Sequence, residues 1–126
     1  MALALVAPAC TGGGRSIRLA DGQRASAHGE ASVAGVSATV VEMEDSYFQP
    51  TVLRGTPGQR LTITLSNQGN SVHDFRIAAQ HIDAGVEAGT PVTVTVTFPE
   101  KGAVTFECRY HLLQNMRGEL VAGGGE

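Results

Sequence analysis

The chain has 126 residues and a formal net charge of −3 at pH 7, with no block of basic residues. This length suits a single domain, and the acidic balance argues against a nucleic-acid partner, which needs a basic surface. No apolar run approaches the roughly 18 residues that a membrane-spanning helix requires. The composition thus leaves the function to be read from the motifs.

The N-terminal segment is built of apolar and small residues and ends in a cysteine, Met1-Ala-Leu-Ala-Leu-Val-Ala-Pro-Ala-Cys10. It resembles the end of a bacterial lipoprotein signal peptide, in which the cysteine becomes the lipidated first residue. The apolar run is short and no basic segment precedes it, so an unstructured tail is the alternative. We expect residues 1–10 to be a signal or lipoprotein segment. The protein is then exported, to the periplasm or the outer side of the cytoplasmic membrane, with Cys10 as the candidate lipid-anchor site.

Residues 11–35 are rich in Gly, Ser, Ala, Arg and Gln and show almost no apolar periodicity. Such a composition predicts a flexible linker, with His28 solvated in it. We expect residues 36–122 to form the folded domain and residues 123–126 to be a disordered tail.

Short runs in the domain alternate apolar and polar residues, which is the pattern of half-buried strands. The crossing segment 78–90 has a weak pattern and is predicted to be a loop with His81 exposed. About six to eight short strands separated by turn signals predict an all-β, antiparallel β-sandwich. The clearest strands are expected at 39–44, 61–65, 72–77, 92–98, 104–108 and 118–122.

A cluster of metal-binding residue types follows the strand at 104–108, in the motif Cys108-x-x-His111-x-x-x-x-Met116. Cys108 shares the inward-facing parity of Val104 and Phe106, whereas His111 and Met116 lie past the strand end. A loop of this length can bring three ligands around one ion.

His73 supplies a second imidazole, from the strand 72–77. It shares the parity of Phe75 and Ile77, so it should point into the core. A core histidine satisfied by a backbone hydrogen bond is the alternative. Two His, one Cys and one Met form the trigonal blue-copper set with a weak axial thioether, which favours a metal site at His73, Cys108, His111 and Met116. Asn70 and Asp74 are the nearest candidates to orient the ring of His73.

These motifs resemble the cupredoxin family, and most of all its plastocyanin and amicyanin group. The resemblance also covers Tyr47-Phe-Gln-Pro50, Asn70-Ser-Val-His73-Asp-Phe and Met116-Arg-Gly-Glu-Leu-Val121. It implies a cupredoxin-like Greek-key β-sandwich with one copper ion cycling between Cu(I) and Cu(II). By resemblance the ligands are His73, Cys108 and His111, with Met116 axial.

One departure concerns Asp74, because many family members carry Asn directly after the first ligand histidine. It leaves open whether the usual hydrogen bond between the two ligand loops forms. The copper domain of cytochrome oxidase subunit II is also similar, but its binuclear site needs two neighbouring cysteines, and Cys108 stands alone here.

The resemblance implies a mononuclear type 1 copper protein that carries single electrons between transient redox partners, such as a cytochrome or a membrane electron-transfer complex. Its expected electron exit is His111, and Tyr110, Leu112 and Leu113 are expected to form the contact patch. Copper storage or delivery through the same ligands is the alternative. We expect no enzyme, because a multicopper oxidase needs His-x-His pairs and the four histidines here form none.

Arg109 and Arg117 lie beside the ligand motif and are candidates to steer an acidic partner. Solvated loop charges with no such role are the alternative.

Overall fold

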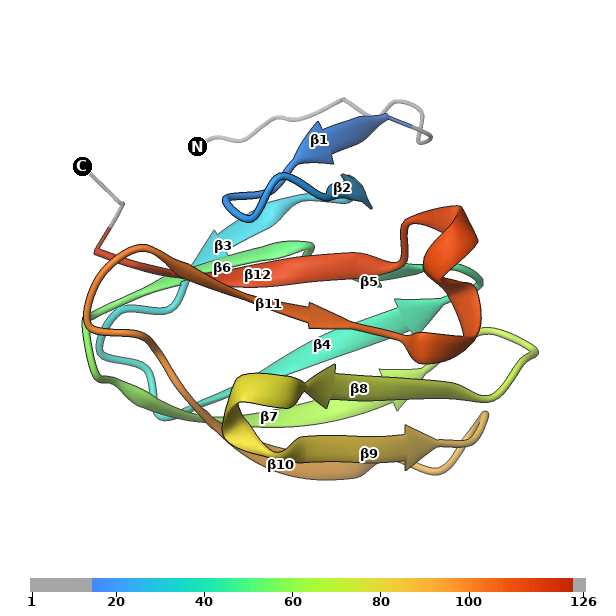
Figure 1. Cartoon of the computed structure of the whole chain (residues 1–126). Coiled ribbons are helices and arrows are strands. Elements are labelled where there is room, and N and C mark those ends of the chain that lie inside the picture. The colour runs from blue at the N-terminus through green and yellow to red at the C-terminus, as the bar shows by residue number, and fades with distance from the viewer. Residues whose placement is uncertain (1–14, 124–126) are drawn as a thin grey trace, which may run out of the picture.

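The computed structural model describes residues 15–123. In it the strands form two main β-sheets and a short two-stranded hairpin (Figure 1). Residues 1–10, with the candidate lipidation site Cys10, lie outside the described residues, as do residues 124–126 of the predicted tail. Among the residues described, no helix has the length and hydropathy needed to cross a membrane.

The smaller of the two main sheets carries the strongest alternation in the sequence. Val92 and Leu65 face each other across the ladder, as do Val96 and Leu61. Leu61, Ile63 and Leu65 are fully buried, so this face is the inner one. The strand order is β10 (Val92–Thr97), β7 (Arg60–Asn67), β4 (Ala38–Glu44) and β5 (Tyr47–Gln49).

The larger sheet carries the predicted metal ligands. Its strand order is β3 (Glu30–Ser32), β6 (Val52–Gly55), β12 (Arg117–Ala122), β11 (Ala103–Glu107), β8 (His73–Ile77) and β9 (Ile82–Val86). Phe75 of β8 and Phe106 of β11 pack against Phe48 of the other sheet, with ring centroids 6.0 and 5.0 Å away. All three rings are fully buried, and each such burial stabilises the fold by roughly 1.5–3 kcal/mol. Because His73 and Cys108 each lie two positions from one of these rings, the aromatic core fixes the base of the metal site.

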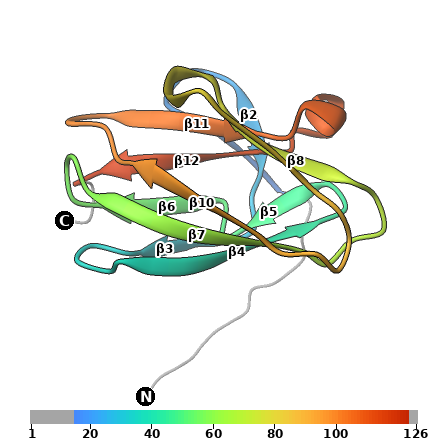
Figure 2. The ribbon, with the colours of Figure 1, turned by 90° about the horizontal axis from the view of Figure 1, so that it is seen from below.

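The predicted all-β sandwich is confirmed, and six of the nine strand pairs within residues 15–123 are antiparallel as expected. Three pairs are parallel: β4 with β7, β6 with β12, and β3 with β6. The reason is that the chain changes sheet between partners. It leaves β4, passes through β6 of the opposite sheet and returns to pair β7 with β4 in the same direction (Figure 2).

The linker predicted for residues 11–35 is wrong over its described part. This segment contains β1 (Ser16–Arg18), β2 (Arg24–Ser26) and β3, each of three residues. Leu19, Ala25 and Val33 are buried. Strands this short show no period, and single apolar residues among Gly and Ser were enough to dock them. The folded unit therefore begins well before residue 36.

The loop predicted for residues 78–90 is also wrong in part. A short 3-10 helix, η3 (Ala78–Gln80), leads into β9, which pairs antiparallel with β8. Ile82 and Val86 share the inward side of β9, but Gly85 between them weakens the pattern. His81 is exposed, as expected.

Candidate metal centre

His73, Cys108 and His111 meet at one end of the sandwich. His73 begins β8, Cys108 follows β11, and His111 lies in the 3-10 segment η4 (Arg109–Gln114), which is the coiled ribbon drawn in orange-red in Figure 1. One ligand atom from each residue lies within 4.8 Å of the other two. His73 and Cys108 are buried, whereas His111 is half-buried. The structure thus brings together three of the four metal ligands that the sequence predicted.

The two sulfur-to-nitrogen distances fit a trigonal metal ion. Cys108 Sγ lies 3.7 Å from His73 Nδ1 and 3.5 Å from His111 Nδ1. Thiolate and imidazole bonds of about 2.3 and 2.0 Å, opened to 120°, would separate sulfur from nitrogen by about 3.7 Å. The residues present therefore suit an ion bound between them.

The ring of His73 is oriented by a carboxylate that the sequence did not indicate. Its Nε2 lies 3.1 Å from Asp45 Oδ1. A proton on Nε2 donated to Asp45 leaves the lone pair of Nδ1 free for a metal. Asn70 and Asp74 were expected in this role. Instead, the backbone N–H of Asn70 donates to Asp45, and the carboxylate of Asp74 accepts hydrogen bonds from Arg109. Asp45 lies in the turn between β4 and β5, where no motif marks it.

The loop before β8 holds Asp45 in place. The backbone N–H groups of Asn70 and Ser71 donate to its carboxylate, at 3.0 and 3.4 Å. The Asn70 bond lowers the pKa of Asp45 against an opposing effect of burial, with further help from Ser71 and His73. Gly69 packs so closely on the Asp45 carboxylate that a Cβ there would collide with it. Asp45 is thus a fixed anion behind His73.

Cys108 is enclosed, and its sulfur accepts the backbone N–H of Asp74 at 3.4 Å. Burial raises the pKa of the Cys108 thiol despite this hydrogen bond. Burial also lowers the pKa of His73. Both shifts favour the neutral forms of Cys108 and His73, and a metal must displace the thiol proton to bind Cys108.

Asp74 does tie the two ligand segments together, although it replaces the usual Asn. Its buried carboxylate accepts the backbone N–H of Arg109 at 2.7 Å and the Nε–H of Arg109 at 3.0 Å. Arg109 also forms an ion pair with Asp83 of β9. The guanidinium balances the charge that Asp74 brings next to Cys108.

Neither arginine next to the ligand motif is free to steer a partner. Arg109 is paired with two carboxylates. The side chain of Arg117 is only 12% exposed. These contacts argue against the predicted role of Arg109 and Arg117 in electrostatic steering of an acidic partner.

A backbone hydrogen bond holds Met116 beside Cys108. The Cys108 N–H donates to the Met116 carbonyl at 3.0 Å, and the Met116 N–H donates to the His111 carbonyl at 3.2 Å. The side chain of Met116 is fully buried. Its role as the axial ligand stays a prediction.

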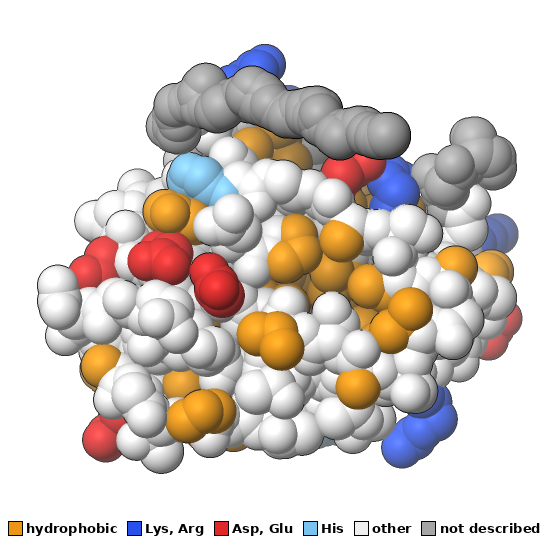
Figure 3. All heavy atoms as spheres, turned by 180° about the vertical axis from the view of Figure 1, so that it is seen from behind, with side chains coloured by type: hydrophobic (Ala, Val, Ile, Leu, Met, Phe, Trp, Pro, Cys, Tyr) orange, Lys and Arg blue, Asp and Glu red, His pale blue; other side chains and the backbone are white. Residues whose placement is uncertain are grey.

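The 3-10 segment that carries the half-buried His111 also exposes apolar side chains. Leu113 is 95% exposed and Tyr110 is 56% exposed, both in η4. Seen from behind the view of Figure 1, apolar side chains also reach the surface in several groups (Figure 3). The predicted contact patch is therefore exposed, with Leu112 only partly so.

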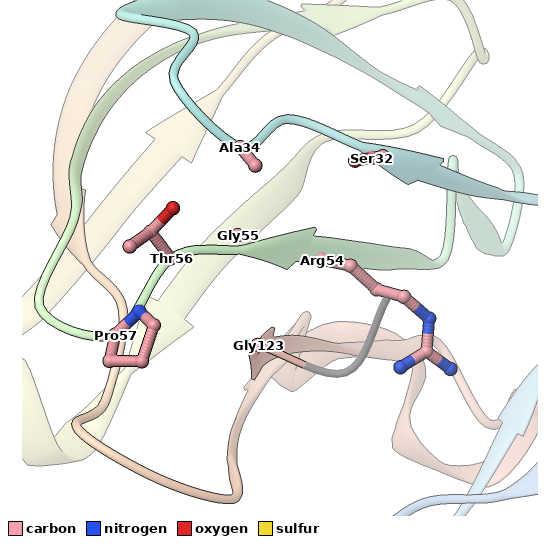
Figure 4. Close-up of a pocket in the computed structure, with 7 residues that line it drawn as sticks. All are labelled: Ser32, Ala34, Arg54, Gly55, Thr56, Pro57 and Gly123. Carbon is pink, nitrogen blue, oxygen red and sulfur yellow. The ribbon is translucent and has the colours of Figure 1, made fainter. Parts of the chain in front are cut away.

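A separate pocket of about 320 Å³ lies at the Gly123 end of β12, away from the end that adjoins Met116 (Figure 4). None of the residues lining it is His, Cys, Asp or Glu, and Arg54 at its rim pairs with Glu30. It offers no metal ligands.

Comparison with known proteins assigns the class. The Cupredoxin-like domain family matches residues 22–122. This chain therefore belongs to the cupredoxin-like domain family, and with its His-Cys-His cluster the family indicates one copper ion as the cofactor. No curated protein sequence matches the chain.

Solved structures agree on the fold. A chain of a heme-copper terminal oxidase dimer is 16% identical with a TM-score of 0.59, covering 70% of this chain and 65% of its own. Reduced auracyanin from Roseiflexus castenholzii is 17% identical with a TM-score of 0.59, covering 69% of this chain and 97% of its own. A reduced tryptophan-to-tyrosine mutant of amicyanin is 21% identical with a TM-score of 0.53, covering 70% and 84%. This chain thus spans nearly all of auracyanin but less than two thirds of the oxidase chain.

Proposed function

We propose that this protein is a mononuclear type 1 copper protein that carries single electrons between redox partners outside the cytoplasm. The observation that carries the proposal is the placement of His73 Nδ1 and His111 Nδ1 within 3.5–3.7 Å of Cys108 Sγ. A thiolate and two imidazoles, with Met116 as the axial thioether, suit both Cu(I) and Cu(II). The bound copper would supply the one-electron redox couple.

In such a carrier the buried ligands and the surface ligand would have different roles. His73 begins β8 and Cys108 directly follows β11, and because these two strands share the aromatic core, the buried ligands should change position little when the charge of the site changes. His111 is the ligand nearest to solvent and is proposed as the electron exit. Tyr110 and Leu113 beside it form a small apolar surface for brief, weak docking. A cytochrome or a membrane electron-transfer complex would be a suitable partner.

Carrier function is favoured over catalysis by the composition of the site. Among residues 15–123, the only group of three or more His, Cys, Asp or Glu placed to hold a metal is His73, Cys108 and His111. A single cluster of this kind suits one copper ion that exchanges electrons, which supports a carrier over a multicopper oxidase. An exported location, with an anchor at Cys10, is part of the proposal and is supported by the sequence alone.

The test is the visible absorption spectrum of the whole chain titrated with Cu(II). We expect an intense blue band that saturates at about one equivalent, as thiolate-to-copper charge transfer requires. Cys108→Ser should lose the band, and His81→Ala, which changes an exposed histidine outside the site, should keep it. A band that persists in Cys108→Ser would refute the assignment.

Copper storage or delivery through the same ligands is tested with the same preparation. Rapid electron self-exchange with slow loss of copper to a chelator supports the carrier. Slow self-exchange with ready transfer of copper to the chelator would instead support delivery.

A further inference from the structure

The N-terminal hairpin, defined as β1, β2 and the turn joining them (residues 16–26), contacts the loop that carries His111 and Met116. The backbone N–H of Ser26 donates to the carbonyl of Asn115 at 2.9 Å. The hydroxyl of Ser26 lies 3.4 Å from the carbonyl of Gln114. Figure 1 shows the hairpin beside β12, on the side where the η4 ribbon rises.

The contacted residue sits at a sensitive point of the ligand loop. Asn115 has a left-handed backbone with φ of 62° and directly precedes Met116. The Met116 carbonyl in turn accepts the N–H of Cys108. A shift of the Asn115 carbonyl would therefore move both Met116 and the backbone of Cys108.

A second contact joins the hairpin to the residue after Met116. Arg117 Nη1 donates to the carbonyl of Arg24 at 3.0 Å and lies 3.4 Å from Asn115 Oδ1. The hairpin thus holds the chain on both sides of Met116.

The hairpin is itself fixed to the sandwich. Ala25 is 0% exposed and Leu19 is buried. Buried Thr51, which precedes β6, uses its hydroxyl to bridge the carbonyls of Ser26 and Phe48, at 3.2 and 2.8 Å. Asp21 in the hairpin turn accepts the Thr105 hydroxyl of β11 at 2.7 Å. Because Thr105 lies on β11 and Thr51 directly precedes β6, these bonds tie the hairpin to the sandwich, and the hairpin can transmit the rigidity of the sandwich to the loop.

We propose that the N-terminal hairpin is a positioning element of the metal centre. It holds the Met116 end of the ligand loop, as the Asp74–Arg109 pair holds the Cys108 end. The effect on copper rests on the proposed function, whereas the effect on the loop does not. Ser26 acts through Asn115, which directly precedes the predicted ligand Met116.

The experiment displaces the hairpin in the whole chain with Ala25→Glu, which forces a charge into a fully buried position. Ala38→Glu, at an exposed position of β4, is the matched control. In the copper-free protein we expect hydrogen exchange at residues 112–116 to accelerate on the order of tenfold in Ala25→Glu and to stay unchanged in Ala38→Glu. In the copper-loaded protein the reduction potential should shift, which general destabilisation would not cause.

Ser26→Pro serves if Ala25→Glu fails to fold. It removes the N–H that donates to Asn115 and leaves the buried side chains of the hairpin intact. Faster exchange at residues 112–116, with β7 and β11 still protected, supports the proposal. Faster exchange confined to the hairpin, with the ligand loop and the potential unchanged, would overturn it. A chain that gives no blue band with Cu(II) but shows the faster loop exchange would refute the proposed function and leave the hairpin's role standing.

Discussion

His73 and His111 present the same ring nitrogen to Cys108, yet the fold holds them in opposite ways. His73 is buried at the start of a strand, and its second nitrogen contacts Asp45. His111 lies at a kink in η4, with φ of −133° and ψ of 38°, and is half-buried. The ring of His111 packs on the ring of His73, with the ring centroids 4.8 Å apart.

In the electron carrier proposed above, this difference would give the two histidines different roles. A ligand fixed by the strand and by a carboxylate defines where the ion sits and keeps it there. A ligand on the surface loop closes the site and gives an electron a short path to solvent. The site can thus be rigid and still reach a partner.

The largest predicted effect comes from replacing each histidine with glycine. Both His73→Gly and His111→Gly should lose the blue band. Added imidazole should restore it in His111→Gly, whose gap opens to solvent, and not in His73→Gly, whose gap is enclosed. The measurement is the visible spectrum during an imidazole titration. Equal rescue of both variants would show that burial does not distinguish the two ligands.

Asp45→Asn should weaken copper binding about 10- to 100-fold, which is the usual loss when the group that orients a ligand histidine is changed. Asn can still accept from Nε2 but lacks the charge that strengthens the bond. Competition with a chelator measures the affinity. Glu44→Gln, a neighbouring carboxylate for which the structure gives no contact with His73, is the control and should bind copper normally.

The sequence predicted the cluster of His73, Cys108 and His111 better than it predicted the residues that support it, and the ligand role of Met116 stays a prediction. Cys108, His111 and Met116 stand close together in one motif, and the parity of Phe75 pointed His73 inward. Asp45 was missed because its contact with His73 joins a turn to a strand that begins 28 residues further along the chain. The hairpin was missed because strands of three residues show no period, so only the tertiary contacts of Leu19 and Ala25 reveal them.

Met116→Leu should keep copper bound and raise the reduction potential, because loss of a weak electron donor disfavours Cu(II) relative to Cu(I). Leu fills a similar buried volume, so the fold should stand. Cyclic voltammetry of the wild type and the variant measures the change. Met43→Leu, another buried methionine on β4, is the matched control. An unchanged potential in Met116→Leu would remove Met116 from the axial position.

The smallest effect is expected from Asp74→Asn. The carboxylate of Asp74 is buried beside Cys108, and its negative charge favours Cu(II) over Cu(I), so its loss should raise the potential. One charge at roughly 5 Å in a medium of dielectric constant 20 is worth about 3 kcal/mol, and the Arg109 guanidinium offsets part of it.

A residual of about 1.4 kcal/mol is a tenfold change in the redox equilibrium, or about 59 mV for one electron. Because Asn can still accept the Arg109 N–H, the hydrogen bond between the ligand segments should remain and the blue band should persist. A change in potential would then report the loss of the charge of Asp74 alone. Asp83→Asn is the control, since Asp83 also pairs with Arg109 but is partly exposed on β9. Its potential should move less. An equal rise in both variants would mean that the unbalanced charge of Arg109, and not the position of Asp74 beside Cys108, sets the potential.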